Sequence, residues 1–227
     1  MITTVIFDLD DTLYDEVDYC KSGFWAVAES VAHLPDTPPA ERVFDTVWKE
    51  FAAGNRKTLF NDALAKLGIA YDAAFIEKLV HVYRNHTPQI TLPNDSKDVL
   101  ETLRGKYALA LLTDGFLPAQ RLKVQALGIE GYFRRILYTE ELGRQFWKPS
   151  PVGFEKLMES LNTKASTSVY VADNEEKDFI APNHLGMPTI QLIRPAALHR
   201  QSARQPHAAA QHIIHSIREL PQFLEGL

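Results

Sequence analysis

The sequence predicts an α/β protein, in which helices cover a parallel sheet and a helical insert follows the first strand. Short apolar runs, typical of strands buried on both faces, alternate with helical patterns, and this alternation indicates βαβ units. The alternation is interrupted once, between about residues 15 and 85, where only helical patterns occur. We therefore expect one α/β domain that is divided by an all-helical insert.

Five apolar runs are predicted to form the sheet. The first covers residues 4–7, is rich in β-branched side chains and stops at a group of carboxylates. The other four cover residues 107–112, 136–138, 168–172 and 189–193. Even the longest is far shorter than the roughly 20 residues that a membrane span needs.

Helical patterns separate these runs and fill the insert. Between the strands they cover residues 95–106, 117–127, 151–161 and 177–185. In the insert they lie near residues 17–33, 40–53, 58–67 and 73–85, and Phe24, Val27 and Val31 there form one apolar stripe. Residues 195–207 lack periodicity and predict a linker, and a last helix is expected near residues 209–224.

Composition excludes several classes of protein. The chain has 227 residues, 45% of them apolar and 23% charged, which is ordinary for a globular protein. A net charge of −5 without a basic run argues against nucleic acid or a membrane surface as a partner. The single cysteine, Cys20, forms no internal disulfide, and the N-terminus has no basic lead-in. We therefore expect a cytoplasmic protein, for which the sequence predicts no particular oligomeric state.

Three carboxylates, Asp8, Asp10 and Asp11, follow the first predicted strand. Ligands of open α/β sheets bind beyond the carboxyl ends of the strands, so this group lies where a site is expected. Carboxylates this close together repel one another unless they share a cation or a proton. The alternative, a solvated turn in which Asp11 and Thr12 cap a helix, accounts for one carboxylate and not for three.

Three further segments carry polar groups after predicted strands or before helices. Thr113, Asp114 and Gly115 form a strand-to-helix turn that suits an anion, although a simple capped turn is the alternative. Lys148 precedes a helix whose start is marked by a proline, although most lone lysines lie on the surface. Asp173 and Asp178 follow another strand. Asp173, at the strand end, is placed to meet Asp8, and these two carboxylates with a backbone carbonyl and waters form a set of oxygen ligands that suits Mg²⁺ better than zinc.

These four features, in this order, resemble the four motifs of the haloacid dehalogenase-like superfamily. The Asp-x-Asp-x-Thr pattern of Asp8, Asp10 and Thr12 is the most specific of them. The resemblance implies a Rossmann-like, three-layer core of residues 1–14 and 91–227, with a helical cap of residues 15–90 between the first two motifs. One departure is Ala172, which stands where the superfamily usually has glycine and leaves slightly less room beside a metal.

The resemblance also assigns a role to each motif residue. Asp8 would be the nucleophile that forms an aspartyl-phosphate. Asp10 would protonate the leaving oxygen and then take a proton from water. The dehalogenases of the superfamily lack an aspartate at this second position, so Asp10 favours phosphoryl transfer. Mg²⁺ would be held by the Asp8 carboxylate, the Asp10 main-chain carbonyl and Asp173.

The remaining motif residues would bind the phosphoryl group or support those that do. Thr113 and Lys148 would contact its oxygens together with the main-chain amides of Leu9 and Asp114. Asp178 would orient Lys148 or a metal-bound water, with Asn174 as its neighbour. Candidates for substrate selection are Tyr14, Asp15, Arg56, Lys57 and Phe116, although a solvated loop is the alternative for Arg56 and Lys57.

The resemblance thus implies a Mg²⁺-dependent phosphomonoesterase acting on a small phosphorylated metabolite, either a nucleotide or a sugar phosphate. Three alternatives stay open. A phosphomutase would return the phosphoryl group to a second hydroxyl of the substrate. A phosphonate hydrolase would need a Schiff-base lysine from the cap, where Lys21 is the only lysine near the relevant part of the first helix. The third alternative is a catalytically silent member that only binds its ligand.

Overall fold

The computed structural model describes residues 1–198 and 206–227. The chain forms two compact units. The first consists of Met1–Val17 and Thr91–Leu227 and contains the sheet, and the second is Asp18–Ile90. The second unit is thus an insertion into the chain of the first, between its first and second strands.

The first unit is built on a parallel sheet. Among the described residues the sheet has six strands in the order β3-β2-β1-β4-β5-β6, and every neighbouring pair is parallel. The strands are β1 (Thr4–Phe7), β2 (Ala108–Thr113), β3 (Arg135–Tyr138), β4 (Ser168–Ala172), β5 (Thr189–Leu192) and β6 (His212–Ile214). The predicted α/β class with a Rossmann-like parallel sheet is confirmed.

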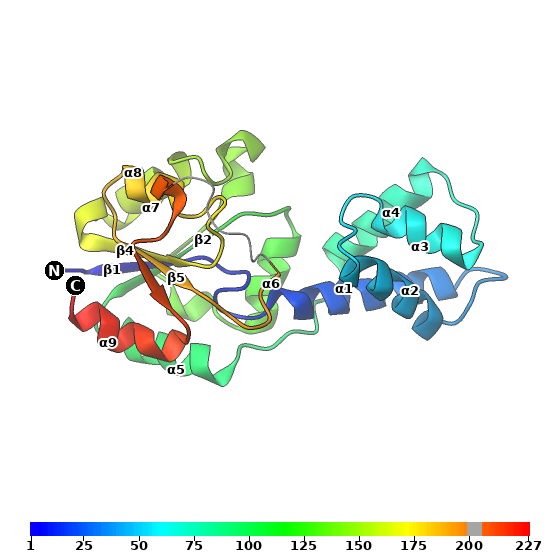
Figure 1. Ribbon diagram of the computed structural model, residues 1–227, viewed down its shortest axis with the longest axis horizontal. Coiled ribbons are helices and arrows are strands. Elements are labelled where there is room, and N and C mark those ends of the chain that lie inside the picture. The colour runs from blue at the N-terminus through cyan, green and yellow to red at the C-terminus, as the bar shows by residue number, and fades with distance from the viewer. Residues whose placement is uncertain (199–205) are drawn as a thin grey trace. The chain divides into compact units, whose positions relative to one another are not determined.

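Helices cover both faces of this sheet and give three layers (Figure 1). On one face lie α7 (Val152–Leu161) and α8 (Ile180–His184), and on the other α5 (Asn94–Arg104) and α9 (Leu220–Glu225). Another helix, α6 (Ala119–Leu127), follows β2. Phe154 and Leu157 of α7 pack with Ile6, Leu112 and the ring of Tyr170 in one buried hydrophobic cluster. Burial of these side chains fixes the sheet on which the strand ends are displayed.

Short 3₁₀ helices occupy several connections of the first unit. They are η1 (Glu130–Tyr132), η2 (Thr139–Leu142), η3 (Arg144–Phe146), η4 (Ala165–Thr167), η5 (Pro206–Ala208) and η6 (Ile217–Glu219). Of these, η2 and η3 lie between β3 and Lys148, so they belong to the segment that presents this lysine.

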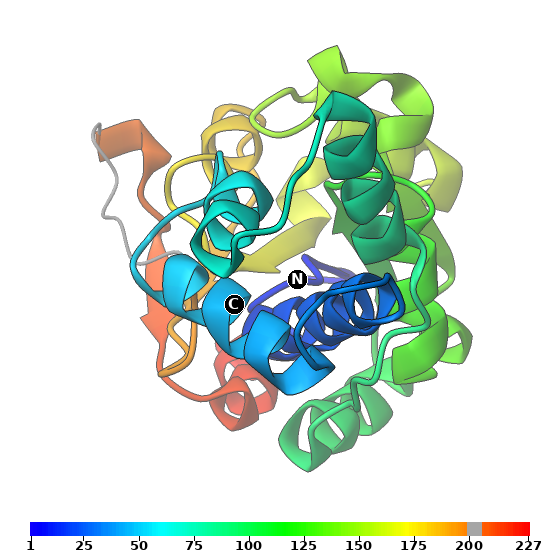
Figure 2. The ribbon, with the colours of Figure 1, turned by 90° about the vertical axis from the view of Figure 1, so that its right-hand side faces the viewer.

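The second unit is helical, as Figure 2 shows in blue to cyan. Its helices are α1 (Glu16–Ala32), which begins in the first unit, α2 (Ala40–Ala52), α3 (Leu59–Leu67) and α4 (Ala73–Asn85). Asp18–Ile90, all of which is described, contains no strand. The ring of Phe24 packs against those of Phe51, Phe60 and Tyr83. At Gly23 a Cβ atom would lie 2.5 Å from the Tyr83 ring, so glycine permits this close approach of α1 and α4.

Two predicted helices differ from the structure. The helix expected over residues 209–224 is wrong, because His212–Ile214 form β6 beside β5, and α9 begins only at Leu220. Pairing along β5 satisfies the backbone hydrogen bonds of these residues and buries Ile214. These contacts outweigh the helix-like spacing of apolar residues in the sequence. The helix expected from residue 177 begins at Ile180, after a turn. Residues 199–205 of the expected linker lie outside the described residues.

Among residues 1–198 and 206–227, none of the helices has both the length and the apolar character of a membrane-spanning segment.

Candidate active site

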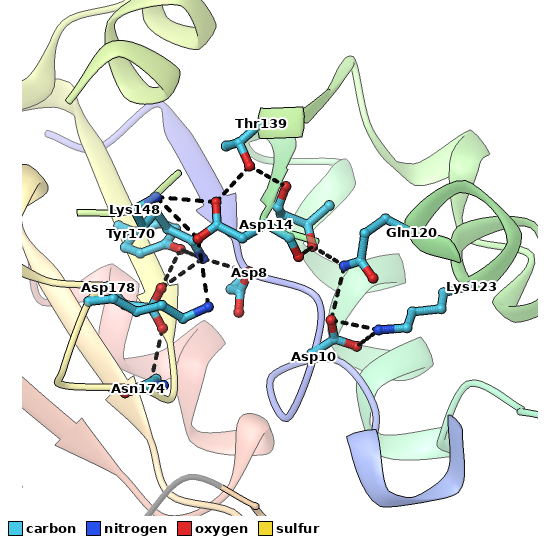
Figure 3. Close-up of polar contacts among 12 residues, drawn as sticks. Asp8, Asp10, Asp114, Gln120, Lys123, Thr139, Lys148, Tyr170, Asn174 and Asp178 are labelled. Carbon is cyan, nitrogen blue, oxygen red and sulfur yellow. Dashed lines mark hydrogen bonds and ion pairs between the residues drawn. The ribbon is translucent and has the colours of Figure 1, made fainter. Parts of the chain in front are cut away.

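Three neighbouring strands end at one edge of the sheet with polar side chains. Asp8 follows β1, Thr113 is the last residue of β2, and Asp173 follows β4. Because β1 lies between β2 and β4 and all three are parallel, their carboxyl ends are adjacent. Figure 3 shows Asp8, Lys148 and Asp178, which come from separate segments, converging at this edge.

Lys148 lies at the centre of the group. Its Nζ atom is 2.8 Å from Asp8 Oδ1, 2.7 Å from Asp178 Oδ1 and 2.9 Å from the hydroxyl of Tyr170. The side chain is almost fully buried. Burial disfavours the charge of Lys148, but Asp178 and Asp8 outweigh it, so its pKa lies well above the usual value. Lys148 is therefore a fixed positive charge beside Asp8.

Asp178 has both carboxylate oxygens engaged. Oδ1 contacts Lys148, and Oδ2 accepts a hydrogen bond of 3.0 Å from the main-chain N–H of Asn174. Burial raises the pKa of Asp178, but Lys148 and Lys177 outweigh it and hold the pKa below the usual value. Asn174 in turn accepts a hydrogen bond from the N–H of Glu176, which shapes the turn after β4. Both residues thus support the position of Lys148.

Asp8 is a buried carboxylate with one strong cationic partner. Its main-chain N–H donates to the carbonyl of Val171 on β4, 2.9 Å away, which fixes its backbone. Burial raises the pKa of Asp8 to about 6, against the opposing effect of Lys148. Near neutral pH the side chain is then largely ionised while little solvated, which favours its use as a nucleophile.

Asp173 offers an unsatisfied oxygen beside Asp8. Its Oδ2 atom is buried and has no hydrogen-bond partner among the described residues. Carboxylate oxygens of Asp8, Asp173 and Asp178 lie within 4.8 Å of one another. Buried oxygens this close need a cation or a proton. Hard oxygen donors suit Mg²⁺, so the residues present fit this ion, with the unsatisfied Oδ2 atom of Asp173 as a ready ligand beside Asp8.

Without metal, the carboxyl group of Asp173 is expected to destabilise the protein as pH rises. Burial, together with Asp178 and Asp8, raises its pKa to about 9. An unfolded chain has an aspartate pKa of about 3.9. Between these values the folded protein holds a proton that the unfolded chain has released, so the free energy of unfolding falls as pH rises, by up to about 1.4 kcal/mol per pH unit.

Asp173→Asn should therefore remove this part of the pH dependence. The measurement is urea unfolding of both proteins in chelator, between about pH 5 and pH 9. We expect the wild type to lose stability relative to the variant across this range. Parallel curves for the two proteins would contradict the raised pKa of Asp173.

Asp114 contributes its side chain where the sequence suggested only its main-chain amide. The carboxylate accepts a hydrogen bond of 2.7 Å from the hydroxyl of Thr139 and one of 3.1 Å from the main-chain N–H of Lys148. Asp114 therefore ties the end of β2 to the segment that carries Lys148. Thr113, the neighbouring residue, is buried and keeps its hydroxyl at the same edge of the sheet.

Asp10 is held by three donors that do not include Lys148, and Figure 3 shows Gln120 and Lys123 among them. Its carboxylate accepts hydrogen bonds from the hydroxyl of Tyr14 at 2.5 Å, the amide of Gln120 at 2.9 Å and the Nζ atom of Lys123 at 2.8 and 2.9 Å. Burial raises the pKa of Asp10, but Lys123 and the other donors outweigh it and hold the pKa below the usual value.

The residues around Asp10 shape the exit from β1. Leu9 lies between the two aspartates, and its carbonyl accepts a hydrogen bond from the N–H of Leu13. Asp11 has a positive φ of 52°, and its carboxylate accepts hydrogen bonds from the N–H groups of Glu16 and Leu198. Asp11 thus caps α1, which accounts for one of the three carboxylates. Asp15 contacts Arg194 at 3.3 Å.

The other candidates for substrate selection have their own local partners. Phe116 packs edge-to-face against Trp147, and Arg144 lies 4.3 Å above its ring. Arg56 belongs to the helical unit, where its guanidinium stacks 3.6 Å above the ring of Phe51. Lys57 is exposed in the same loop.

Sequence reasoning missed the supporting residues of the site. They are Gln120, Lys123, Thr139 and Tyr170. The signal for the first two was present, because both polar residues fall on the buried face of a predicted helix, where a lysine needs a partner. Tyr170 lies within a buried apolar strand, and a tyrosine hydroxyl there also requires a hydrogen-bond partner. Thr139 carried no such signal, since it follows a short strand.

The fold and these side chains define a class of protein. It is an α/β enzyme of the Rossmann-like type, with aspartates and a buried lysine at the carboxyl ends of its central strands. The model of the haloacid dehalogenase-like hydrolases matches residues 2–186, which is most of the chain. The chain belongs to this family, and the resemblance that its motifs carry is confirmed.

Named relatives cover the chain almost end to end. Glyceraldehyde 3-phosphate phosphatase of Methanocaldococcus jannaschii is 26% identical, and the match covers all of this chain and 99% of the relative. Ribulose-1,5-bisphosphate 5-phosphatase of Halopiger xanaduensis is 28% identical, with 97% of this chain and 98% of the relative covered. The crystal structure of a 2-haloacid dehalogenase from Pseudomonas syringae superposes with a TM-score of 0.66 at 25% identity, covering 100% and 99% of the two chains.

Proposed function

We propose that this protein is a Mg²⁺-dependent phosphomonoesterase that hydrolyses small phosphorylated metabolites, with phosphates of sugars and related carbohydrates as the leading class. The observation that carries the proposal is the cluster of Asp8, Lys148 and Asp178 beside the unsatisfied carboxylate oxygen of Asp173. Two of the phosphatases similar to this chain act, by their names, on glyceraldehyde 3-phosphate and on ribulose 1,5-bisphosphate.

Asp8 is the proposed nucleophile. Its carboxylate attacks phosphorus, and the bond between phosphorus and the leaving oxygen breaks. Because its pKa in the free site lies below the usual value, Asp10 must take up a proton in the substrate complex, and it gives this proton to the leaving oxygen. The products are the free alcohol and an aspartyl-phosphate on Asp8. Tyr14, Gln120 and Lys123 stabilise the ionised Asp10 that remains.

The second step restores both aspartates. Water attacks the phosphorus of the aspartyl-phosphate, and Asp10 takes a proton from this water. The bond between Asp8 and phosphorus breaks, inorganic phosphate leaves, and Asp8 is again a carboxylate. Asp10 is protonated once more and ready for the next leaving group.

The phosphoryl group is held by charge and by hydrogen-bond donors. Lys148, which Asp178 keeps beside Asp8, neutralises its oxygens, and Thr113 with the main-chain amides of Leu9 and Asp114 donates to them. Asp8, the main-chain carbonyl of Asp10 and Asp173 would hold Mg²⁺. This ion, when bound, supplies positive charge to the transferring phosphoryl group.

A segment that includes the helical unit is the proposed cap domain of this enzyme. We assign it to residues 15–90 and the core to residues 1–14 and 91–227. A cap of this kind excludes water and selects the substrate. Tyr14, Asp15, Arg56, Lys57 and Phe116 remain the residues we propose for that selection.

A phosphate-release screen in Mg²⁺ tests the function. Its panel contains glyceraldehyde 3-phosphate, ribulose 1,5-bisphosphate, hexose phosphates, nucleoside monophosphates, a phosphonate and a 2-haloacid. We expect release from one or more carbohydrate phosphates. Interconversion of a hexose phosphate without phosphate release would favour a phosphomutase instead, and carbon–phosphorus cleavage a phosphonate hydrolase. Turnover of the 2-haloacid alone would favour a dehalogenase. If no compound of the panel is turned over, the result would favour a protein that only binds its ligand.

Removal of the metal is expected to stop phosphate release. In excess chelator the rate should fall by about 10²-fold or more, because the transferring phosphoryl group then lacks the positive charge that the ion would supply. Added Mg²⁺ should restore it. Asp173→Asn should need about 10-fold or more Mg²⁺ for half-maximal rate, since it loses one ionised oxygen donor. Full activity of the wild type in excess chelator would overturn the assignment of the metal.

A further inference from the structure

Two buried polar residues on α6 connect separate parts of the site. Gln120 and Lys123 have exposed fractions of only 2% and 4%. They are three positions apart and therefore share one face of the helix. Burial of a lysine costs free energy unless its charge is paired, so Lys123 is expected to have an anionic partner.

Asp10 is that partner for Lys123. The Nζ atom of Lys123 lies 2.8 Å from Asp10 Oδ1 and 2.9 Å from Oδ2, so it bridges both oxygens of the carboxylate. With Tyr14 on Oδ1 and Gln120 on Oδ2, the carboxylate is held from three directions. Donors on both oxygens fix the rotation of the carboxylate as well as its position.

Gln120 links Asp10 to Thr113. Its Nε2 atom is 2.9 Å from Asp10 Oδ2 and 2.6 Å from the hydroxyl oxygen of Thr113. An ionised carboxylate only accepts hydrogen bonds, so the nitrogen of the amide must face Asp10. The same nitrogen then donates its second hydrogen to Thr113. The hydroxyl oxygen of Thr113 accepts this hydrogen bond from Gln120, so the hydroxyl proton points away from Gln120.

The turn after β2 leaves space for this glutamine. Gly115 has a φ of +141°, and a Cβ atom at this position would lie 2.7 Å from Cδ of Gln120. A side chain at residue 115 would therefore both strain the backbone and push Gln120 from its place. Gly115 thus leaves the space that Gln120 occupies, and Gln120 and Lys123 contact Asp10 directly.

We propose that Gln120 and Lys123 are positioning residues, which hold the general acid and base Asp10 and the phosphate-binding Thr113 in one fixed arrangement. This inference rests on the proposed phosphatase function and names residues that the motifs do not include. Its distinctive consequence concerns the leaving group. Asp10 matters most when the leaving oxygen needs a proton, and little when the leaving group departs easily.

The experiment compares Lys123→Met with the wild type on two esters in saturating Mg²⁺. One is the best alkyl phosphate of the screen, and the other is 2,4-dinitrophenyl phosphate, whose leaving group needs no proton. For the alkyl ester we expect kcat/KM to fall by about 10- to 100-fold, and for the aryl ester by about threefold or less. Lys156→Met, an exposed lysine of α7, is the matched control and should change neither value.

A second set of variants separates positioning from general damage. In an Asp10→Asn background, Lys123→Met should cause no further loss on the alkyl ester, since its effect acts through Asp10. This double variant also removes both buried charges and is expected to fold even if Lys123→Met does not. Lys123→Arg should recover part of the lost kcat/KM, and Gln120→Leu should lower kcat/KM for the alkyl ester more than for the aryl ester.

Three outcomes overturn the inference, and they distinguish its failure from the failure of the proposed function. Equal losses of kcat/KM on both esters, or additive losses in the double variant, would show a merely structural role for Lys123 while the phosphatase function stands. A wild-type protein that releases phosphate from neither ester in Mg²⁺ would overturn the proposed function, and this inference with it.

Discussion

Replacing Asp8 with asparagine is expected to abolish phosphate release while leaving the fold intact. The amide cannot attack phosphorus, so kcat should fall by about 10⁴-fold or more. The fold should survive because Lys148 keeps Asp178 as a partner at 2.7 Å, and because a buried carboxylate is replaced by a neutral group of the same shape. We expect the Tm of Asp8→Asn to equal or exceed that of the wild type.

Two measurements complete this test. Wild-type protein denatured during turnover should carry the mass of one phosphoryl group on the peptide that contains Asp8, and Asp8→Asn should carry none. Asp98→Asn, which changes an exposed aspartate of α5, is the matched control and should keep normal activity. Near-normal activity of Asp8→Asn would rule out the covalent mechanism.

Replacing Lys148 with methionine is expected to damage both activity and stability. The substitution leaves the carboxylates of Asp8 and Asp178 buried without their shared cation. Removing one partner of a buried ion pair costs about 3–5 kcal/mol in the free energy of unfolding, because the remaining charge is uncompensated. Activity should fall by about 10³-fold, since the phosphoryl oxygens lose a fixed positive charge.

The double variant Lys148→Met/Asp178→Asn distinguishes the two roles of Lys148. Removal of the second charge should restore much of the free energy of unfolding, measured in urea with chelator present, without restoring phosphate release. If Lys148→Met keeps wild-type stability, the buried contacts of this lysine do not hold the site together. If the double variant recovers activity, Lys148 acts only as a structural partner of Asp178.

Much of the fold follows from local pattern in the sequence. The strands β1 and β4 begin and end where their apolar runs do. Short continuous apolar runs are typical of strands that are buried on both faces, and both strands are of this kind. The pattern failed at β6. There, His212–Ile214 form a strand only because the edge of β5 offers backbone partners, and that edge is a property of the assembled sheet.

The motif residues were accessible from sequence for the same reason, since Asp8 and Asp173 directly follow strands and Thr113 is the last residue of one. Their supporting contacts were not. The link from Lys123 to Asp10 joins residues that are far apart in the chain, and no local rule predicts which carboxylate a buried lysine meets. Asp114 shows the same limit, because its side chain acts on the main chain of Lys148, across the end of the sheet.

The central place of β1 has a consequence for how the chain folds. Thr4 pairs with Ala108 on one side and with Ser168 on the other. Both partners of the first strand therefore lie more than one hundred residues further along the chain. Contacts so distant in sequence form slowly, whereas Asp18–Ile90 packs from neighbouring helices. During synthesis the helical insert is therefore expected to fold first, and Asp8 to reach its working position only after β4 has been made.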